Sequence, residues 1–448
     1  MRGHRSFASE EEAAFIRGCA PRRGVASFRP PVRYLKVTLF ITFIVSLFVS
    51  ALYELGLLYQ LDLALAGMLG LHAPPVFADR AWQYPLFIGS ALAVAWATVD
   101  IPRKSLKCVV AGLAFLEVLA GAWIAHMFGR FFSPFATLVG IASSFTAAFI
   151  YARTEGGMRK NIVSSLCGDR VSKGMFETLV NADHPLTFEG EVTEASIVVC
   201  EIFNHQELTE QIKVSDYVAL QNSFLKNASD FLVERGGYLD KCDGESLRVI
   251  FGAPLPDAGH ASTACEAALA LARRLDEVNR ECFQVWKQMF DFRIGVNSGE
   301  MVVAAYGSGR LGNFSVAGEP VEFARRLCAA NTIYGSRILV GCQTFFDAES
   351  DVEVRPMELI QRTPENSSRE EVYEILSLKH ELSSTEMERR DLFWKGIVYY
   401  REQRWDEALQ LFYTARPAEG LDRPVEFYIR RIEQLREGLP QLAWTGGV

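Results

Sequence analysis

Residues 236–251 read Gly-Gly-Tyr-Leu-Asp-Lys-Cys-Asp-Gly-Glu-Ser-Leu-Arg-Val-Ile-Phe. The pair Asp243-Gly244 is a strong hairpin signal, because both residues tolerate the backbone that a two-residue turn requires. The residues on either side predict strands at 238–242 and 246–251. We therefore expect a β-hairpin in the second half of the chain.

The segments around this hairpin alternate between strand and helix patterns. Ala195–Ile202 reads as a buried strand, and an apolar stripe from Tyr217 to Phe231 predicts a helix that ends at Gly236-Gly237. After the hairpin we expect a helix at 264–275, strands at 290–296, 301–305 and 314–317, and a helix opened by Pro320. This order predicts a ferredoxin-like α/β domain.

The first half of the chain is apolar. Residues 37–152 contain only ten charged residues, and a span of the bilayer takes about 20 apolar residues. Basic residues cluster before the first run, between the second and third, and after the fourth, which predicts both termini on the cytoplasmic side of the inner membrane. The four predicted spans are Val37–Tyr53, Tyr84–Thr98, Cys108–Met127 and Phe131–Ala152. Leu55–His72 is expected to be an external interfacial segment, and a fifth span is the alternative.

Charge and cysteine content narrow the function classes. The formal net charge is −8, and residues 153–448 carry −13. A domain this acidic is not expected to bind nucleic acid, which requires basic surfaces. The nine cysteines show no paired metal-ligand spacing, so we expect reduced thiols in a cytoplasmic domain.

These patterns divide the chain into five segments. The last one carries apolar and aromatic residues at helical spacing and resembles one tetratricopeptide-type helix pair, which cannot bury its apolar face alone and is expected to pack on the domain or on a partner. The segments are a basic lead-in at 1–36, a four-span membrane domain at 37–152, a helical coupler at 153–189, the α/β domain at 190–378 and an all-α tail at 385–438.

Residues 307–312, Gly-Ser-Gly-Arg-Leu-Gly, match the spacing of a dinucleotide-binding loop. That loop must be followed by a helix, with an acidic residue about 20 positions later. Here a strand is expected to follow, so we interpret the segment as a hairpin turn.

A distributed set of motifs carries a family resemblance. It comprises Val198–Phe203, Gly236–Glu245 with Phe251–Pro254, Phe292–Gly299, Phe314–Val321 and Ala324–Leu327. In order and spacing, residues 190–345 resemble the catalytic domain of class III adenylyl/guanylyl cyclases. Such enzymes join the 3′-hydroxyl of a nucleoside triphosphate to its own α-phosphate and release pyrophosphate.

The resemblance assigns expected roles to seven residues. It implies two divalent ions, Mg²⁺ or Mn²⁺, in each site of a homodimer whose sites form between two chains, and it implies a 3′,5′-cyclic AMP signalling function. Lys241 and Ser315 match adenine-recognising positions and favour ATP, Arg326 matches the arginine that stabilises the transition state, and Glu322 stands at the ribose-orienting position. The expected metal ligands are Glu201, Ile202 and Glu245.

Three positions depart from the family pattern. Glu201 and Glu245 stand where the family has Asp, and Glu322 stands where it has Asn. A carboxylate at 322 repels a triphosphate and is also expected to pair with Arg326, four residues later on the helix. The loop Asn204-His205-Gln206 replaces the family's Gly-Phe-Thr, and His205 is expected to be a loop residue.

These departures keep other hypotheses open. The chain could be a pseudo-cyclase that binds nucleotide or regulates, paired with an intact cyclase chain in a heterodimer. A transporter with a regulatory domain is the third reading, and the scarcity of polar residues within the membrane spans argues against it.

Overall fold

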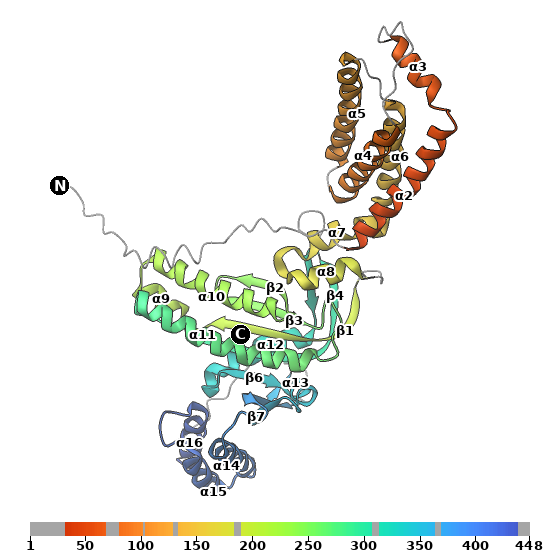
Figure 1. Ribbon diagram of the computed structural model, residues 1–448. Coiled ribbons are helices and arrows are strands. Elements are labelled where there is room, and N and C mark those ends of the chain that lie inside the picture. The colour runs from red at the N-terminus through yellow and green to blue at the C-terminus, as the bar shows by residue number, and fades with distance from the viewer. Residues whose placement is uncertain are drawn as a thin grey trace, which may run out of the picture. The chain divides into compact units, whose positions relative to one another are not determined.

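The computed structural model describes residues 32–68, 80–101, 104–128, 133–182, 190–306, 313–362 and 369–437. They fall into two compact units (Figure 1). The helical unit comprises Gly24–Ser165 and Glu177–His184, and the sheet unit contains Leu166–Phe176 and Pro185–Val448. Residues 307–312, which match the dinucleotide-loop spacing, lie outside the described residues, but the strand expected after them is present at Asn313–Ala317.

The helical unit is built from long apolar helices. Three described helices are long and apolar enough to cross a membrane, at Tyr34–Glu54, Ser105–Ala125 and Pro134–Tyr151. The expected span at Tyr84–Thr98 lies in α4, which is 21 residues long but does not meet the same apolar criterion. The helices are α2 (Val32–Glu54), α3 (Tyr59–Met68), α4 (Arg80–Asp100), α5 (Lys104–Met127), α6 (Pro134–Tyr151) and α7 (Glu155–Leu166).

Two polar residues near the start of α4, Gln83 and Tyr84, have partners on α2. The Tyr53 hydroxyl donates to Gln83 Oε1 at 2.9 Å, and the Tyr84 hydroxyl donates to Glu54. Both bonds join the start of α4 to the end of α2. Further along, Phe87 is buried against α2 and α6, because α4 packs on both of these helices.

An eight-stranded mixed sheet forms the centre of the sheet unit. Its order is β2-β3-β1-β4-β6-β8-β7, with β5 paired to β4, and all pairs are antiparallel except β4 with β6. The strands are β1 (Glu191–Ile202), β2 (Tyr238–Asp243), β3 (Ser246–Phe251), β4 (Phe292–Tyr306), β5 (Asn313–Ala317), β6 (Ile338–Gly341), β7 (Val352–Gln361) and β8 (Arg369–Leu378).

The predicted hairpin at Asp243-Gly244 is confirmed, since β2 and β3 pair on either side of it. The two strands expected at 290–296 and 301–305 are instead one continuous strand, β4. The whole of β1 pairs with β4, from Glu191 opposite Val303 to Ile202 opposite Phe292, and this long ladder prevents a break.

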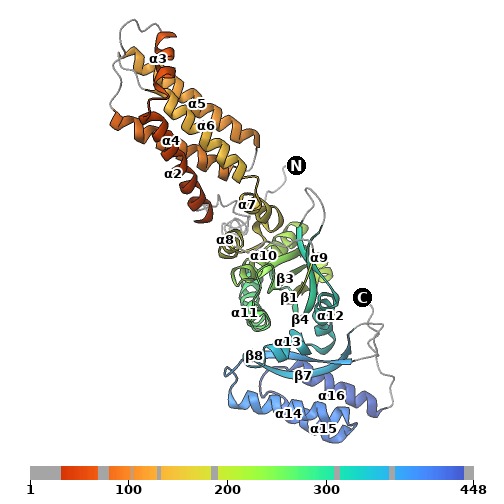
Figure 2. The ribbon, with the colours of Figure 1, turned by 90° about the vertical axis from the view of Figure 1, so that its right-hand side faces the viewer.

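Helices cover both faces of the sheet (Figure 2). Ile338 and Val340 of β6 pack in the core with α10 and α11, whereas Leu339 packs with α12. Alternate strand residues point to opposite faces, so α12 lies on the other face from α10 and α11. The helices between α7 and the C-terminal tail are η1 (Gly168–Arg170), α8 (Lys173–Asn181), α9 (His205–Gln211), α10 (Val214–Glu234), α11 (His260–Trp286), α12 (Glu319–Tyr334) and α13 (Cys342–Asp347).

Gly295 sets the position of α12 on the sheet. A Cβ at Gly295 would lie 2.2 Å from the Ala324 carbonyl oxygen and 2.4 Å from the Cys328 amide nitrogen. Only glycine permits this contact between two backbones. The Asn331 amide fixes the far end of α12 by donating to the Ile294 carbonyl at 2.9 Å.

The C-terminal tail has three helices, α14 (Ser384–Arg401), α15 (Trp405–Ala415) and α16 (Arg423–Arg436), where the sequence suggested one pair. It packs on the sheet unit and shares one apolar core with α12, β6, β7 and β8. The Arg355 guanidinium joins Glu374 of β8 to Asp422 at the start of α16, each at 2.7 Å. The likeness to a tetratricopeptide pair stays a prediction.

Candidate active site

Ser315, an expected base-recognition residue, contacts β2, a strand that is distant from it in sequence. The register of β2 against β3 shifts between Leu239 and Lys241, which leaves Asp240 as an extra residue in β2. The Ser315 hydroxyl of β5 donates a hydrogen bond of 2.5 Å to Asp240 Oδ1. Asp240 is 1% exposed, and Lys241, the next residue of β2, is exposed.

The expected metal ligands lie at one end of β1. Glu201 and Ile202 are its last two residues, and Glu245 lies in the neighbouring hairpin turn. The Ile202 amide donates to the Glu245 carbonyl at 2.9 Å, so the strand end and the turn are joined. Burial raises the pKa of Glu201, Arg325 opposes this shift, and the carboxylates of Asp243 and Glu245 add to it.

This donor set suits an oxygen-preferring cation, because it offers two carboxylates and a carbonyl. Among the described residues, however, no group of three or more His, Cys, Asp or Glu side chains is arranged to hold a metal ion. The Glu245 side chain is 46% exposed. Both carboxylates carry one methylene more than Asp, so metal binding would require their side chains to turn inward.

His205 was expected in a loop, and that expectation is wrong. It is the first residue of α9, because the chain turns into a helix directly after Asn204. Its Nδ1 lies 3.5 Å from Glu245 Oε2 and 3.4 Å from the Ile202 carbonyl oxygen. Sequence reasoning missed this contact, and the signal that could have revealed it is the position of His205 three residues after a strand-end ligand.

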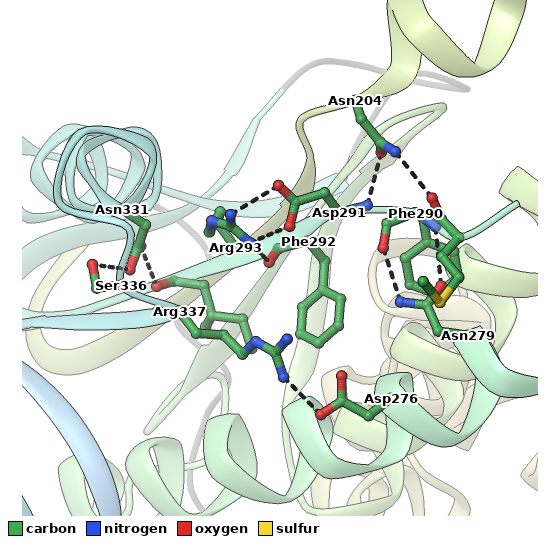
Figure 3. Close-up of polar contacts among 12 residues, drawn as sticks. Asn204, Asp276, Asn279, Phe290, Asp291, Phe292, Arg293, Asn331, Ser336 and Arg337 are labelled. Atoms are coloured by element: carbon green, nitrogen blue, oxygen red, sulfur yellow. Dashed lines mark hydrogen bonds and ion pairs between the residues drawn. The ribbon is translucent and has the colours of Figure 1, made fainter. Parts of the chain in front are cut away.

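The Asn204 side chain, just before α9, ties the end of β1 to the segment before β4 (Figure 3). Its Oδ1 accepts from the Asp291 amide at 2.7 Å, and its Nδ2 donates to the Met289 carbonyl at 3.0 Å. Asp291 is itself held by the Arg293 guanidinium. Asn204, the first residue of the segment that replaces Gly-Phe-Thr, is thus fixed by its side-chain hydrogen bonds.

The expected pairing of Glu322 with Arg326 is also wrong. Glu322 Oε2 lies 3.2 Å from Arg325 Nε, an i,i+3 pair on α12. Arg326 instead donates from Nη1 to the main-chain carbonyl of Arg362 at 2.7 Å, at the end of β7. Residues of α12 and β7 share one apolar core, and Arg326 reaches from α12 to the residue that follows β7.

Arg362 completes this side of the site. Its guanidinium bridges Glu319 at 2.7 Å and Glu370 at 3.0 Å, and these contacts hold the strand end that receives Arg326. Burial is the largest influence on the pKa of Arg326 and lowers it, while Glu319 opposes that shift. Arginine stays protonated under such shifts, so Arg326 keeps a positive charge.

Residues 189–345 match the family model of the adenylate and guanylate cyclase catalytic domain. The chain is 24% identical over 193 residues to adenylate cyclase 1 of Rhizobium meliloti, which covers 43% of this chain and 29% of that protein. It is 25% identical over 244 residues to the terminal-differentiation-specific adenylate cyclase of Dictyostelium discoideum, covering 53% of this chain and 11% of that protein.

Among solved structures, an adenylyl cyclase from P. aeruginosa is 21% identical, with a TM-score of 0.40, and covers 43% of this chain and 99% of that one. The matched part is thus less than a third of the length of either curated relative.

Proposed function

We propose that the class III nucleotidyl cyclase catalytic domain at residues 189–345 converts ATP into 3′,5′-cyclic AMP and pyrophosphate, in a chain anchored to the inner membrane by its helical unit. The observation that carries this proposal is the arrangement of Lys241, Asp240 and Ser315. The Ser315 hydroxyl bonds to Asp240, the residue directly before Lys241, and Lys241 and Ser315 are both of the types that recognise adenine in the family.

Each of the candidate site residues would have a separate role in this reaction. Lys241 would donate to a ring nitrogen of adenine, and Ser315 would accept from the exocyclic amine. Arg326, held toward β7 by the Arg362 carbonyl, would stabilise the negative charge that develops on the α-phosphate. Glu201, the Ile202 carbonyl and Glu245 would hold Mg²⁺ or Mn²⁺, which supplies charge stabilisation to the phosphates and the attacking hydroxyl.

Assembly of the site is part of the proposal. The family resemblance assigns the metal ligands to one chain and Lys241, Ser315, Glu322 and Arg326 to its partner, so we propose a homodimer. Three helices able to span a bilayer support membrane anchoring. We propose α4 as the fourth span, with both termini and the cyclase domain cytoplasmic, because its polar residues Gln83 and Tyr84 already have partners on α2.

The second candidate function is a pseudo-cyclase that binds nucleotide without turnover, alone or in a heterodimer with an intact cyclase. The half-exposed Glu245 favours it, as does the lack of a gathered metal cluster among the described residues. The pairing of Glu322 with Arg325 weakens it, because this pair leaves Arg326 to its contact with Arg362.

The deciding experiment uses the full chain in detergent, with ATP or GTP and with Mg²⁺ or Mn²⁺. Cyclic AMP formation that is lost in Arg326→Ala and kept in Arg280→Ala, an exposed arginine on α11, would establish the enzyme. If the wild type makes no product, the triple variant Glu201→Asp, Glu245→Asp, Glu322→Asn is assayed next. Product from the triple variant but not from the wild type would establish a degenerate site. If neither protein makes product, a nucleotide-binding measurement decides between a regulatory role and a structural role.

A further inference from the structure

We infer that Asp240 is a positioning residue for base selectivity: its carboxylate accepts the only hydrogen bond that the Ser315 hydroxyl can donate, so that Ser315 offers the nucleotide base lone pairs alone. This inference rests on the proposed function, because it concerns the same nucleotide site. It adds a buried residue to which the family resemblance gave no role.

The geometry fixes the direction of the hydrogen bond. Ser315 Oγ lies 2.5 Å from Asp240 Oδ1, and an ionised carboxylate can only accept. The second oxygen, Oδ2, is paired with the Arg248 guanidinium of β3. The Arg248 guanidinium has only donors and pairs with the second oxygen, so the carboxylate acts as the acceptor on both sides and the proton in the Ser315–Asp240 bond belongs to the serine.

The surroundings hold Asp240 in this orientation. Asp240 is 1% exposed, and both oxygens of its carboxylate are bonded, one to Ser315 and one to Arg248. Its main-chain carbonyl accepts from Arg170 Nη1 at 3.0 Å. Two residues before it, the Tyr238 hydroxyl donates to the Phe314 carbonyl at 2.6 Å, which ties β2 to β5 next to Ser315. The carboxylate is therefore a fixed acceptor.

The consequence is discrimination between two purine bases. Adenine presents an amine at position 6, which donates, and guanine presents a carbonyl oxygen there, which accepts. A hydroxyl with a free proton can rotate to suit either group. A hydroxyl whose proton is committed to Asp240 can accept from adenine but meets the oxygen of guanine with its own lone pairs. Ser315 alone would be permissive, and Ser315 bonded to Asp240 is selective.

The test measures binding, so it does not depend on turnover. The full chain in detergent with Mn²⁺ is titrated with the 3′-deoxy forms of ATP, GTP and purine riboside triphosphate, which lacks a group at position 6. None of these ligands can cyclise. We expect the ATP analogue to bind roughly tenfold more tightly than the GTP analogue, with the purine analogue between them, since one hydrogen bond changes binding by about three- to tenfold.

The variants separate Asp240 from a general structural effect. In Asp240→Asn the amide can donate to the Ser315 oxygen, which leaves the Ser315 hydroxyl free to donate its own hydrogen bond to the base. The ratio of ATP affinity to GTP affinity should therefore fall to within about threefold of unity. Ser315→Ala should lose the preference for ATP over the purine analogue, and adding Asp240→Asn to Ser315→Ala should change nothing further. Asp276→Asn, which alters an arginine-paired aspartate bonded to Arg337 (Figure 3), should keep the wild-type ratio.

A folding failure of Asp240→Asn would not end the test. The double variant Asp240→Asn, Arg248→Gln removes both charges, so no buried charge is left unpaired, and it should show the same loss of selectivity. A wild-type ratio in Asp240→Asn or in the double variant overturns the inference. Equal binding of ATP and GTP by the wild type overturns it while leaving the proposed cyclase in place, and the absence of any nucleotide binding overturns both.

Discussion

Glu322 forms its ion pair with Arg325, at 3.2 Å, on the exposed side of α12. The side chains are 65% and 48% exposed, so the pair contributes little to folding. Its importance is electrostatic. Arg325 offsets a negative charge at a position where the proposed substrate carries a triphosphate, and it also lowers the pKa of Glu201 against the effect of burial.

Arg325→Ala should therefore weaken ATP binding by about three- to tenfold, because one positive charge near the phosphates is worth about 1 kcal/mol in a partly exposed site. The melting temperature should not change measurably. Titration with 3′-deoxy-ATP measures the affinity. Arg325→Lys keeps the charge and should bind like the wild type, and an unchanged affinity in Arg325→Ala would contradict the assigned role.

Glutamates at the proposed metal positions should make the proposed cyclase prefer Mn²⁺. Mg²⁺ requires short, near-ideal octahedral contacts, which the longer side chains of Glu201 and Glu245 meet poorly. After removal of metal by EDTA, Mn²⁺ should restore a rate roughly tenfold higher than Mg²⁺ does. The ratio should approach one in Glu201→Asp with Glu245→Asp. Glu207→Asp, the same change on α9, is the matched control and should leave the ratio alone.

Gly295→Ala should displace α12 from the sheet. The added Cβ meets backbone atoms at 2.2 and 2.4 Å, and a backbone cannot move aside as a flexible side chain does. We expect a loss of about 2 kcal/mol or more in stability and a loss of Arg326-dependent activity. Thermal melting measures the first effect, and product formation measures the second. Gly174→Ala, in α8 with nothing within 4 Å of its added Cβ, should not lower the melting temperature. Equal melting of both variants would refute the close approach.

Asp422→Ala should loosen the tail from the sheet unit. The Asp422 carboxylate binds Arg355, which is 8% exposed, and it also caps α16 by accepting from the Val425 amide. Loss of both contacts should cost about 1–3 kcal/mol. The matched change is Asp406→Ala, whose carboxylate is 84% exposed and lies 3.4 Å from Arg436. Thermal melting of the full chain should show a clear decrease for the first variant and almost none for the second.

The fourth span can be tested by topology. Reporter fusions after Leu57 and after Ile101 should report opposite sides of the membrane if α4 spans it, with the fusion after Ile101 cytoplasmic. A fusion after Arg436 should report the same side as the one after Ile101. Both fusions flanking α4 on one side would show that only three helices cross.

Much of the fold could be predicted because its signals are local. The Asp243-Gly244 turn determines where β2 ends and β3 begins, and Pro320 stands in the first turn of α12. The break expected within β4 was wrong because a glycine-containing stretch was interpreted without its partner strand. Pairing with all of β1 keeps β4 continuous, and that constraint comes from residues about 100 positions earlier.

The sequence by itself determined the apolar first half, the cyclase motifs and the identity of the seven candidate site residues, because composition, turn chemistry and motif spacing are properties of neighbouring residues. Only the tertiary structure decided which atoms those residues touch. Ser315 meets Asp240 because β5 pairs with β4 and lies beside β2. Arg326 reaches Arg362 because Gly295 lets α12 lie close to the sheet. Hydrogen-bond partners depend on strand register and helix packing, and these are set by contacts between segments far apart in the chain.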